Sequence, residues 1–331
     1  MRSVLPRSIT WGVMALPLLL LTGCGGGGGD PGDPPPTEAA RIAAAADTAQ
    51  STSNACNPIR PFYWEVGNSA AAKVAGSVPG SAGSATYTAS TVMNVASASK
   101  WLYGAYVVQR RNGVLTAEDI KFLHFRSGYT SFSICLPGDT VNSCLLRGSN
   151  DTYTAANDGK FYYDGGHMQK HADLMGLGAM GNAALADELR SQLGTDIAMA
   201  YSQPQPAGGV TSTAADYARF LRKLLAGNLR LGAILGTQAV CTNPAICASA
   251  VATPVPLNES WDYSLGHWVE VDPIKGDGAF SSAGAFGFYP WIDAGKTSYG
   301  IVARQAALGS GDDSMYCGRL IRKAWLTGVA Q

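Results

Sequence analysis

The residues that could do chemistry begin with a serine and a lysine three positions apart, Ser97 and Lys100. Apolar residues at helical spacing follow from Trp101 to Val108, and they predict a helix that starts near Ser97 and stops at Gly113. Ser97 and Lys100 then lie one turn apart on the same face. A serine hydroxyl needs a base to become a nucleophile, and a partly desolvated lysine can supply one. The spacing alone is weak evidence, because a serine at a helix start is commonly an N-cap.

The residues around this pair extend the pattern. Residues 94–100, Asn-Val-Ala-Ser-Ala-Ser-Lys, resemble the nucleophile segment of the serine β-lactamase and penicillin-binding superfamily. They are most similar to the branch that contains class C β-lactamases, DD-peptidases, family VIII esterases and nylon-oligomer hydrolases. Residues 120–129, 193–195 and 208–216 resemble further motifs of this branch, so that the resemblance covers about residues 91–304.

The resemblance implies roles for three side chains. Ser97 would attack a carbonyl, while Lys100 and a tyrosine would handle the proton. The family's second motif, Tyr-x-Asn, matches the stretch Phe-Tyr-Tyr-Asp-Gly-Gly and points to Tyr163, with Tyr162 as the register alternative. Both tyrosines could also be core aromatics. Gly165 stands at the asparagine position, where we expect it to lie against the substrate without an amide that could contact Lys100 and a substrate carbonyl.

The family's third motif, Lys-Thr-Gly or His-x-Gly, matches residues 280–288. The resemblance implies an oxyanion hole made of the backbone N–H groups of Ser97 and Ala285. Small residues suit a strand edge where a substrate approaches the backbone, so Ser282 and Gly284 are expected to bind substrate. Ser282 replaces the family's cation or histidine, and it could equally be an ordinary strand residue.

Gly165 and Ser282, which stand where the family has an asparagine and a cation or histidine, bear on the substrate. The family uses its asparagine and its cation on β-lactam and D-alanyl amides, so their absence favours uncharged carboxylic esters or linear amides. We therefore expect a serine hydrolase that forms an acyl-enzyme on Ser97 and needs no metal or organic cofactor.

His167 and His171 are four residues apart, but no metalloprotease glutamate and no third ligand accompany them. Two alternatives stay open: a DD-peptidase or β-lactamase, and a non-catalytic cell-envelope binding protein of the same fold.

The elements that must position these residues are expected to form an α+β, β-lactamase-like fold. The resemblance implies an antiparallel sheet built from both chain ends and flanked by helices. The middle of the chain would supply a mostly helical subdomain, with the pocket between the two. Ser212 or Thr213 can cap a helix whose first turn holds Asp216 and whose apolar face starts at Tyr217. We interpret that helix as scaffold.

The N-terminus has the anatomy of an export signal. Two arginines precede an apolar run over residues 9–21, which is short for a membrane span. Leu-Thr-Gly-Cys then resembles the bacterial lipoprotein processing box, which implies a signal peptide over residues 1–23 and a lipid on Cys24; an ordinary signal peptide is the alternative. Residues 24–50 are predicted to be the lipid anchor and a flexible linker, with an Ala-rich stretch that is either a short helix or more tether. Residues 51–331 would then be the hydrolase domain, exported and anchored in the cell envelope at the outer membrane, facing the periplasm or the cell surface.

Six cysteines follow Cys24, and an even number in an exported chain predicts disulfides. Six cysteines allow 15 pairings. Cys135 with Cys144 and Cys241 with Cys247 are close enough to close local loops, which leaves Cys56 and Cys317 to join the two ends of the domain. A zinc site is disfavoured, because no Cys-x-x-Cys spacing occurs.

The charge of the chain is low and balanced. It carries 24 Lys and Arg against 24 Asp and Glu, and 15% of its 331 residues are charged where about 25% is usual. A nucleic-acid partner would require a clustered basic footprint, so none is expected. The low charge extends to the predicted pocket, which favours a neutral acyl substrate over an anionic one.

Overall fold

The computed structural model describes residues 34–307, 309 and 311–331, and the chain divides into two units, Met1–Pro35 and Pro36–Gln331. The predicted signal peptide over residues 1–23, Cys24 and the first part of the predicted linker lie outside the described residues. Within the described part of the chain, no helix has the length and apolar character needed to cross a membrane. The second unit is described below.

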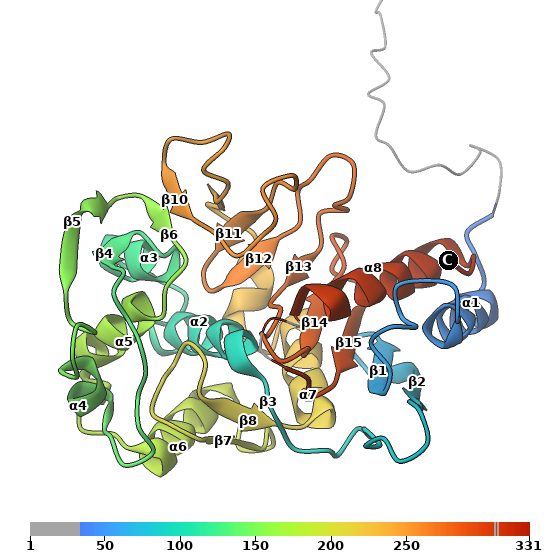
Figure 1. Ribbon diagram of the computed structural model, residues 1–331, viewed down its shortest axis with the longest axis horizontal. Helices are drawn as coiled ribbons and strands as arrows, with labels where there is room; N and C mark the ends of the chain where they lie inside the picture. The colour runs from blue at the N-terminus through green and yellow to red at the C-terminus, as the bar shows by residue number, and fades with distance from the viewer. Residues whose placement is uncertain (1–33, 308, 310) are drawn as a thin grey trace, which may run out of the picture. The chain divides into compact units, whose positions relative to one another are not determined.

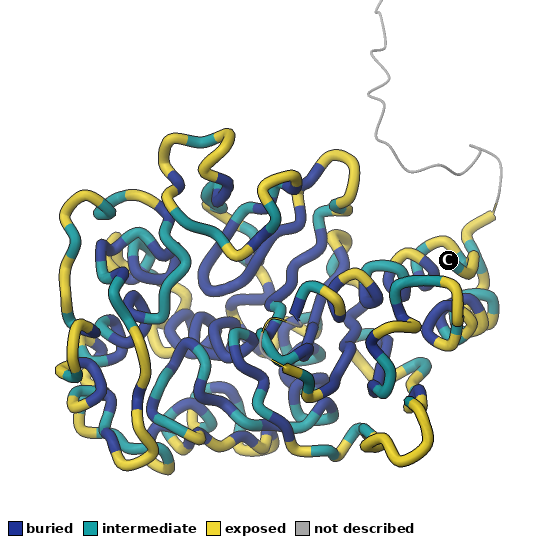
Figure 2. Tube along the Cα trace, in the orientation of Figure 1, coloured by how far each residue is buried: buried dark blue, intermediate teal, exposed yellow. Residues whose placement is uncertain are grey.

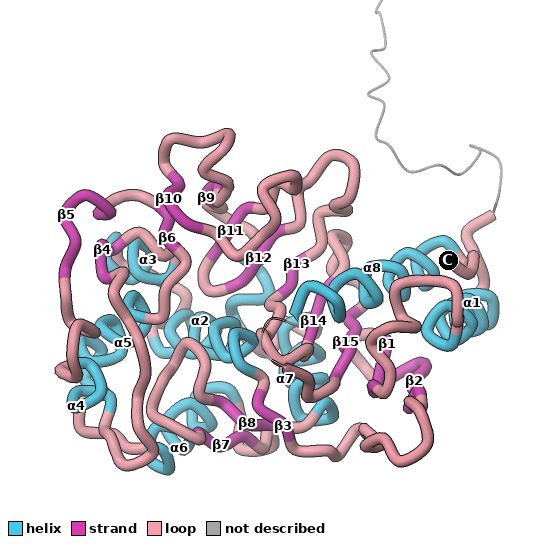
Figure 3. The backbone as a smooth tube through the Cα atoms, in the orientation of Figure 1, coloured by secondary structure: helices cyan, strands magenta, loops and turns pink. Residues whose placement is uncertain are grey.

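This unit contains both helices and strands, and the strands that follow residue 239 come one after another until the last helix (Figures 1 and 3). The helices described are α1(Glu38–Gln50), α2(Ser99–Arg110), α3(Ala117–Leu123), α4(Val141–Leu145), α5(Gly166–Ala172), α6(Asn182–Leu193), α7(Ala214–Leu225) and α8(Gly311–Thr327), with short turns at η1(Ala96–Ala98), η2(Asp173–Leu177) and η3(Arg230–Ile234). The strands described are β1(Phe62–Gly67), β2(Ala72–Val78), β3(Met93–Asn94), β4(Ser127–Tyr129), β5(Tyr153–Asp158), β6(Phe161–Tyr162), β7(Met199–Tyr201), β8(Val210–Ser212), β9(Val240–Cys241), β10(Ala250–Ala252), β11(Asp262–Ser264), β12(His267–Val269), β13(Phe280–Ser281), β14(Tyr289–Ile292) and β15(Tyr299–Ala303).

The main sheet joins the two ends of the unit. Within the described residues it has eight strands in the order β2-β1-β15-β14-β13-β12-β11-β9, and its neighbours pair antiparallel. β1, from the start of the unit, pairs with β15, from its end, so that Tyr63 lies opposite Ala303. The predicted α+β fold, with an antiparallel sheet from both chain ends, is therefore confirmed.

Helices cover both faces of this sheet (Figure 1). Along β15, Tyr299 accepts a hydrogen bond from Arg222 of α7 at 2.8 Å, whereas Val302 packs near Gly318 of α8. Positions 299 and 302 differ by an odd number of residues, so their side chains point to opposite faces. A Cβ at Gly318 would lie 2.4 Å from the Tyr289 ring, so the close approach of α8 to β14 requires a glycine there.

The Ala-rich stretch before residue 51 is a helix of the folded unit. Thr37 caps α1 by accepting a hydrogen bond from the Ala40 N–H, and Ala45 and Ala49 are fully buried. α1 packs along α8, where Arg41 donates to the carbonyl of Trp325 at 3.4 Å. The folded unit thus begins at Pro36, earlier than the boundary at residue 51 that the sequence predicts, because small alanine side chains let two helices approach closely.

The three disulfides are those predicted from the cysteine spacing: Cys135–Cys144, Cys241–Cys247 and Cys56–Cys317. Cys56–Cys317 links residues 261 positions apart, with Cα atoms 4.6 Å from each other. It joins the segment after α1 to the middle of α8. The bond therefore closes almost the whole folded unit into one covalent loop.

The middle of the chain forms the helical part of the unit, and α2 runs through its interior (Figure 2). Every residue of α2 from Ser99 to Val108 is buried. A Cβ at Gly104 would lie 2.1 Å from the Leu265 carbonyl oxygen, so α2 touches the turn between β11 and β12 through a glycine. Packing on all sides fixes the N-terminal end of α2, where the candidate nucleophile lies.

Candidate active site

Ser97 lies in the tight turn η1, which connects β3 to α2. Ala96, the preceding residue, has φ 45°, a left-handed conformation that is unfavourable for a residue with a Cβ. The turn is held in place by the Asn94 side chain, which accepts from the Ala96 N–H at 2.7 Å, and by Tyr217 of α7, which donates to the Ala98 carbonyl at 2.9 Å. These contacts fix a strained turn that presents the Ser97 hydroxyl.

Lys100 is one turn further along and lies within hydrogen-bond distance of Ser97. Its Nζ donates to Ser97 Oγ at 3.0 Å and to the Ala207 carbonyl at 2.7 Å. Lys100 is 5% exposed, and burial lowers its pKa to about 7, against a smaller opposing effect of Asp164. A substantial fraction of Lys100 is therefore neutral near pH 7 and able to accept a proton from Ser97.

Tyr163 completes the group around the serine hydroxyl. Its ring centroid is 4.9 Å from Lys100 Nζ. Burial raises the pKa of Tyr163 to about 12, and a hydrogen bond with Ser97 acts against this rise. Tyr163 also lines the cavity that Ser97 faces, whereas Tyr162 is absent from the described residues lining it. The geometry favours Tyr163 over Tyr162 for the predicted role.

Two backbone N–H groups near the serine are available to an oxyanion. Ala285 lies in a tight turn closed by the bridge between Gly284 and Phe288. Among the described residues, neither the Ser97 N–H nor the Ala285 N–H donates a hydrogen bond. Both residues line the same cavity. This arrangement is consistent with the predicted pair of donors for a developing negative charge.

The cavity in front of Ser97 has a volume of about 230 Å³. Its walls are mainly apolar and come from the loop before β11, from β12, from the turn after β13 and from α8; they include Trp261, Trp268, Val255, Pro254, Pro256 and Met315. Asp312, at the start of α8, is the one carboxylic acid among the described residues that line it. The space suits an apolar substrate segment next to the nucleophile.

No protein-family model matches the chain, and no curated protein matches it. Among solved structures, simvastatin synthase from Aspergillus terreus superposes with a TM-score of 0.60 at 13% identity, covering 87% of this chain and 97% of that one. A penicillin-binding protein homologue from Pyrococcus abyssi gives 0.58 at 13% identity over 82% and 74% of the two chains, and a β-lactamase from Mycobacterium bovis gives 0.53 at 15% over 81% and 96%.

The chain has the serine β-lactamase and penicillin-binding-protein fold. The similarity predicted from residues 94–100 is thereby confirmed at the level of the fold. Within this β-lactamase fold, Ser97, Lys100 and Tyr163 come together as the sequence predicts. The other predicted residues, Ser282, Gly284 and Gly165, lie nearby and contact protein groups that the sequence did not indicate.

Ser282 and Gly284 support the nucleophile turn. The Ser282 side chain is buried and donates to the Ser97 carbonyl at 3.1 Å. A Cβ at Gly284 would lie 2.2 Å from the Val95 carbonyl oxygen, so this position is restricted to glycine by the backbone beside Ser97. Among the described residues, the cavity is lined by their neighbours Ala283 and Ala285, and not by Ser282 or Gly284. Both residues therefore hold the turn that carries Ser97, and their predicted contact with substrate stays a prediction.

Gly165 is half-buried, with two side chains close to it in this β-lactamase fold. A Cβ there would lie 3.0 Å from the Phe132 ring and 3.4 Å from Gln205 Nε2. Gln205 Oε1 accepts from the Gln203 side chain at 2.8 Å, which orients the Gln205 amide nitrogen. An amide absent from position 165 is therefore present nearby on a different loop. No sequence motif marks Gln205, since only the fold brings residues 203–208 to this place.

Asp164 is a second residue that the sequence analysis missed. Its carboxylate accepts from the Gly166 N–H at 2.7 Å and from the Phe132 N–H at 3.2 Å. Burial raises the pKa of Asp164, and the backbone N–H donors and Lys100 act in the other direction. Its position directly after Tyr163 was the available signal. Asp164 adds a negative charge that restrains the fall in the pKa of Lys100.

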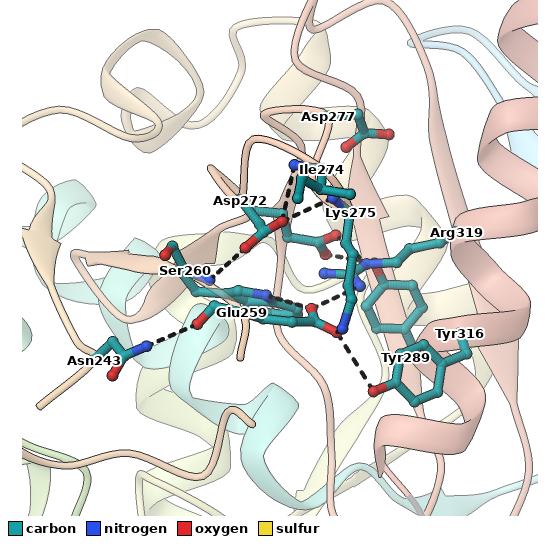
Figure 4. Close-up of polar contacts among 12 residues, drawn as sticks. Asn243, Glu259, Ser260, Asp272, Ile274, Lys275, Asp277, Tyr289, Tyr316 and Arg319 are labelled. Carbon is teal, nitrogen blue, oxygen red and sulfur yellow. Dashed lines mark hydrogen bonds and ion pairs between the residues drawn. The ribbon is translucent and has the colours of Figure 1, made fainter. Parts of the chain in front are cut away.

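A polar network around Glu259 and Arg319 is drawn in Figure 4, and it anchors the cavity wall that carries Trp261. Glu259, 1% exposed, accepts from Trp261 Nε1 at 3.1 Å and from Arg319 of α8 at 2.9 Å. Lys275 and Tyr316 also approach this carboxylate, at 3.3 Å and 3.5 Å. The loop before β11 is thus tied to α8, and the indole of Trp261 is held in one orientation.

Proposed function

We propose that this protein is a serine hydrolase that cleaves carboxylic esters or linear amides through an acyl-enzyme on Ser97. The observation that carries this proposal is the 3.0 Å contact between Ser97 Oγ and Lys100 Nζ, together with a pKa of Lys100 of about 7. A serine beside a base of that pKa is able to lose its proton as it attacks. The predominantly apolar cavity in front of it favours an acyl compound with little charge.

The reaction proceeds in two halves. Neutral Lys100 takes the proton of Ser97 Oγ as that oxygen bonds to the substrate carbonyl carbon, and the N–H groups of Ser97 and Ala285 stabilise the oxyanion. The ammonium of Lys100 returns a proton, through the Tyr163 hydroxyl, to the leaving alcohol or amine as its bond to carbon breaks. Water then attacks the acyl carbon, its proton passes to Ser97 Oγ by the same groups, and a carboxylic acid is released.

The test compares substrates on the purified protein. Wild type should hydrolyse a short-chain p-nitrophenyl ester, while the Ser97→Ala variant should fall to the rate of the uncatalysed reaction. A chromogenic β-lactam should be turned over much more slowly than the ester, because position 165 lacks an amide and Ser282 replaces a cation. Faster turnover of the β-lactam would favour the β-lactamase or DD-peptidase alternative, and no turnover of either would favour the binding protein.

We also propose that the protein is exported and lipid-anchored through Cys24. The three disulfides in the described residues support an oxidising compartment. In cells expressing the full chain, wild type should incorporate labelled fatty acid and sediment with membranes. The Cys24→Ser variant should lose the label and become soluble. An unlabelled wild-type protein would indicate an ordinary signal peptide.

A further inference from the structure

One charged side chain stands out in a mainly apolar cavity. Asp312, in the first turn of α8, lines the same space as Ser97, Trp261 and Trp268. It is half-buried, in a wall whose other described residues carry no charge and, apart from the hydroxyls of Ser97 and Tyr163, are mainly apolar. A carboxylate in such surroundings is costly unless something compensates its charge.

No side chain among the described residues pairs with this carboxylate. Among the described residues, the Asp312 side chain has no hydrogen-bond or ion-pair partner, whereas its neighbour Asp313 lies 3.6 Å from Arg304. Burial raises the pKa of Asp312, and the negative charges of Asp313 and Glu259 add to the rise. Only Arg319 acts in the opposite direction.

Arg319 is already committed to other carboxylates. Its guanidinium donates to Glu259 at 2.9 Å and to Glu270 at 2.9 Å, as part of the network that anchors Trp261 (Figure 4). Lys275 also pairs with Glu259 at 3.3 Å and Arg322 with Glu270 at 2.8 Å, so the charges of these two buried glutamates are matched within the network itself. None of these cations pairs with Asp312, so a cation bound in the cavity would be attracted to its carboxylate.

We propose that Asp312 is a substrate-binding residue that selects acyl compounds carrying an alkylammonium group. The ammonium pairs with Asp312, and the methylene groups between it and the scissile carbonyl pack on the apolar walls around Trp261 and Trp268. This inference rests on the proposed hydrolase function and revises the expected substrate from a neutral ester or amide to one that carries a single alkylammonium group. In a pocket of otherwise low charge, this one carboxylate distinguishes cationic from neutral substrates.

The experiment compares two isosteres. One is a p-nitrophenyl ester whose acyl chain ends in trimethylammonium, and the other is the same ester ending in tert-butyl; a choline ester and its 3,3-dimethylbutyl analogue test the leaving-group side. We expect wild type to prefer the cationic member of at least one pair about tenfold in kcat/KM. Asp312→Asn should bring that ratio near one, whereas Asp313→Asn, which changes an exposed neighbouring carboxylate, should keep the wild-type ratio. Equal rates on both members of both pairs, or a preference that survives Asp312→Asn, would overturn the proposal.

A binding measurement separates this proposal from the catalytic one. The Ser97→Ala protein should bind butyltrimethylammonium more tightly than 3,3-dimethylbutanol, as read by the change in tryptophan fluorescence, and a second Asp312→Asn change should remove the difference. If the wild type hydrolyses no ester yet shows this selective binding, the hydrolase function is wrong and the Asp312 site stands. If esters are cleaved but neither rate nor binding depends on the cation, the Asp312 proposal is wrong alone.

Discussion

Burial assigns different roles to the two proton-handling side chains beside Ser97. It lowers the pKa of Lys100 to about 7 and raises that of Tyr163 to about 12. Lys100 is therefore the group that can accept a proton near neutral pH, while Tyr163 stays protonated and can pass a proton on. Neither role requires a histidine.

Replacing Lys100 tests the base directly. Lys100→Ala should lower kcat/KM for a p-nitrophenyl ester by about 10²–10⁴-fold, the usual contribution of a general base. Lys100→Arg should be as defective, because a guanidinium keeps its charge in water and in protein and cannot accept the proton. Steady-state rates with circular dichroism as a folding control check this, and an active Lys100→Arg enzyme would exclude the lysine as base.

The pH profile provides an independent test of the same residue. Protonated Lys100 cannot act as base, so kcat/KM should be low in acid and rise with pH through an inflection near 7. Ionisation of Tyr163 should become important only near pH 12. A profile measured with an ester whose hydrolysis is corrected for the background rate checks this, and a rise centred above pH 9 would show that Lys100 keeps an ordinary pKa.

At the scale of elements, the sequence predicted the parts of the site that lie close together along the chain. Ser97 and Lys100 share one helix start, so their mutual position follows from helical spacing. Gln205, Glu259 and Asp312 reach the site on separate loops and on α8, and no local pattern connects them. The close approach of Gly284 to the Val95 carbonyl could not be predicted either, because the packing of the segment after β13 against the nucleophile turn is a tertiary feature.

The anchoring of α8 to the sheet and to the loop before β11 is expected to depend on buried charges. Replacing Glu259 by alanine leaves Arg319 with one partner fewer and releases Trp261, and breaking a buried pair in this way costs about 3–5 kcal/mol. Urea unfolding of Glu259→Ala, compared with the Glu118→Ala change on exposed α3 surface, measures the loss. A stability equal to wild type would show that the network contributes nothing.

The same network predicts how stability responds to acid. Burial acts to raise the pKa of Glu270. The opposing effect of Arg322 and Arg319 is larger, so the pKa falls from its ordinary value of 4.5 to about 2. The unfolded chain therefore binds this proton more readily, so the stabilisation is fully present above about pH 4.5 and is lost as pH falls toward 2. Unfolding free energies at several pH values should decrease over this range in wild type and decrease less in Glu270→Gln.

At the scale of the whole molecule, the two ends of the chain are joined by the β1–β15 pairing, by α1 on α8 and by Cys56–Cys317. The sequence predicted the disulfide from the even cysteine number and the sheet from resemblance. It placed the domain start at residue 51, because an Ala-rich segment after a Gly- and Pro-rich stretch has the composition of a tether. The packing of α1 against α8 in the folded unit shows that this segment is a docked helix, and no pattern within residues 38–50 indicates that contact.

Removing the long-range disulfide should cost more than removing a local one. The Cys56→Ser and Cys317→Ser double change opens a loop of 261 positions, and we expect a loss of about 2–5 kcal/mol. The matched double change at Cys241 and Cys247 opens a loop of 6 positions and should cost less, because its closure constrains the unfolded chain less. Denaturant unfolding of both variants checks the order, and equal losses would contradict it.

The central claim is that Ser97 is an activated nucleophile, and labelling with a fluorophosphonate tests it most directly. Wild type should take up one equivalent at Ser97, measured by intact mass and peptide mapping, with a rate that rises through pH 7. Ser99→Ala, a buried serine two residues away whose hydroxyl accepts from the Val210 N–H at 3.2 Å, should label like wild type, whereas Ser97→Ala should not label. Labelling of Ser97→Ala at the wild-type rate, or no labelling of wild type, would contradict the account.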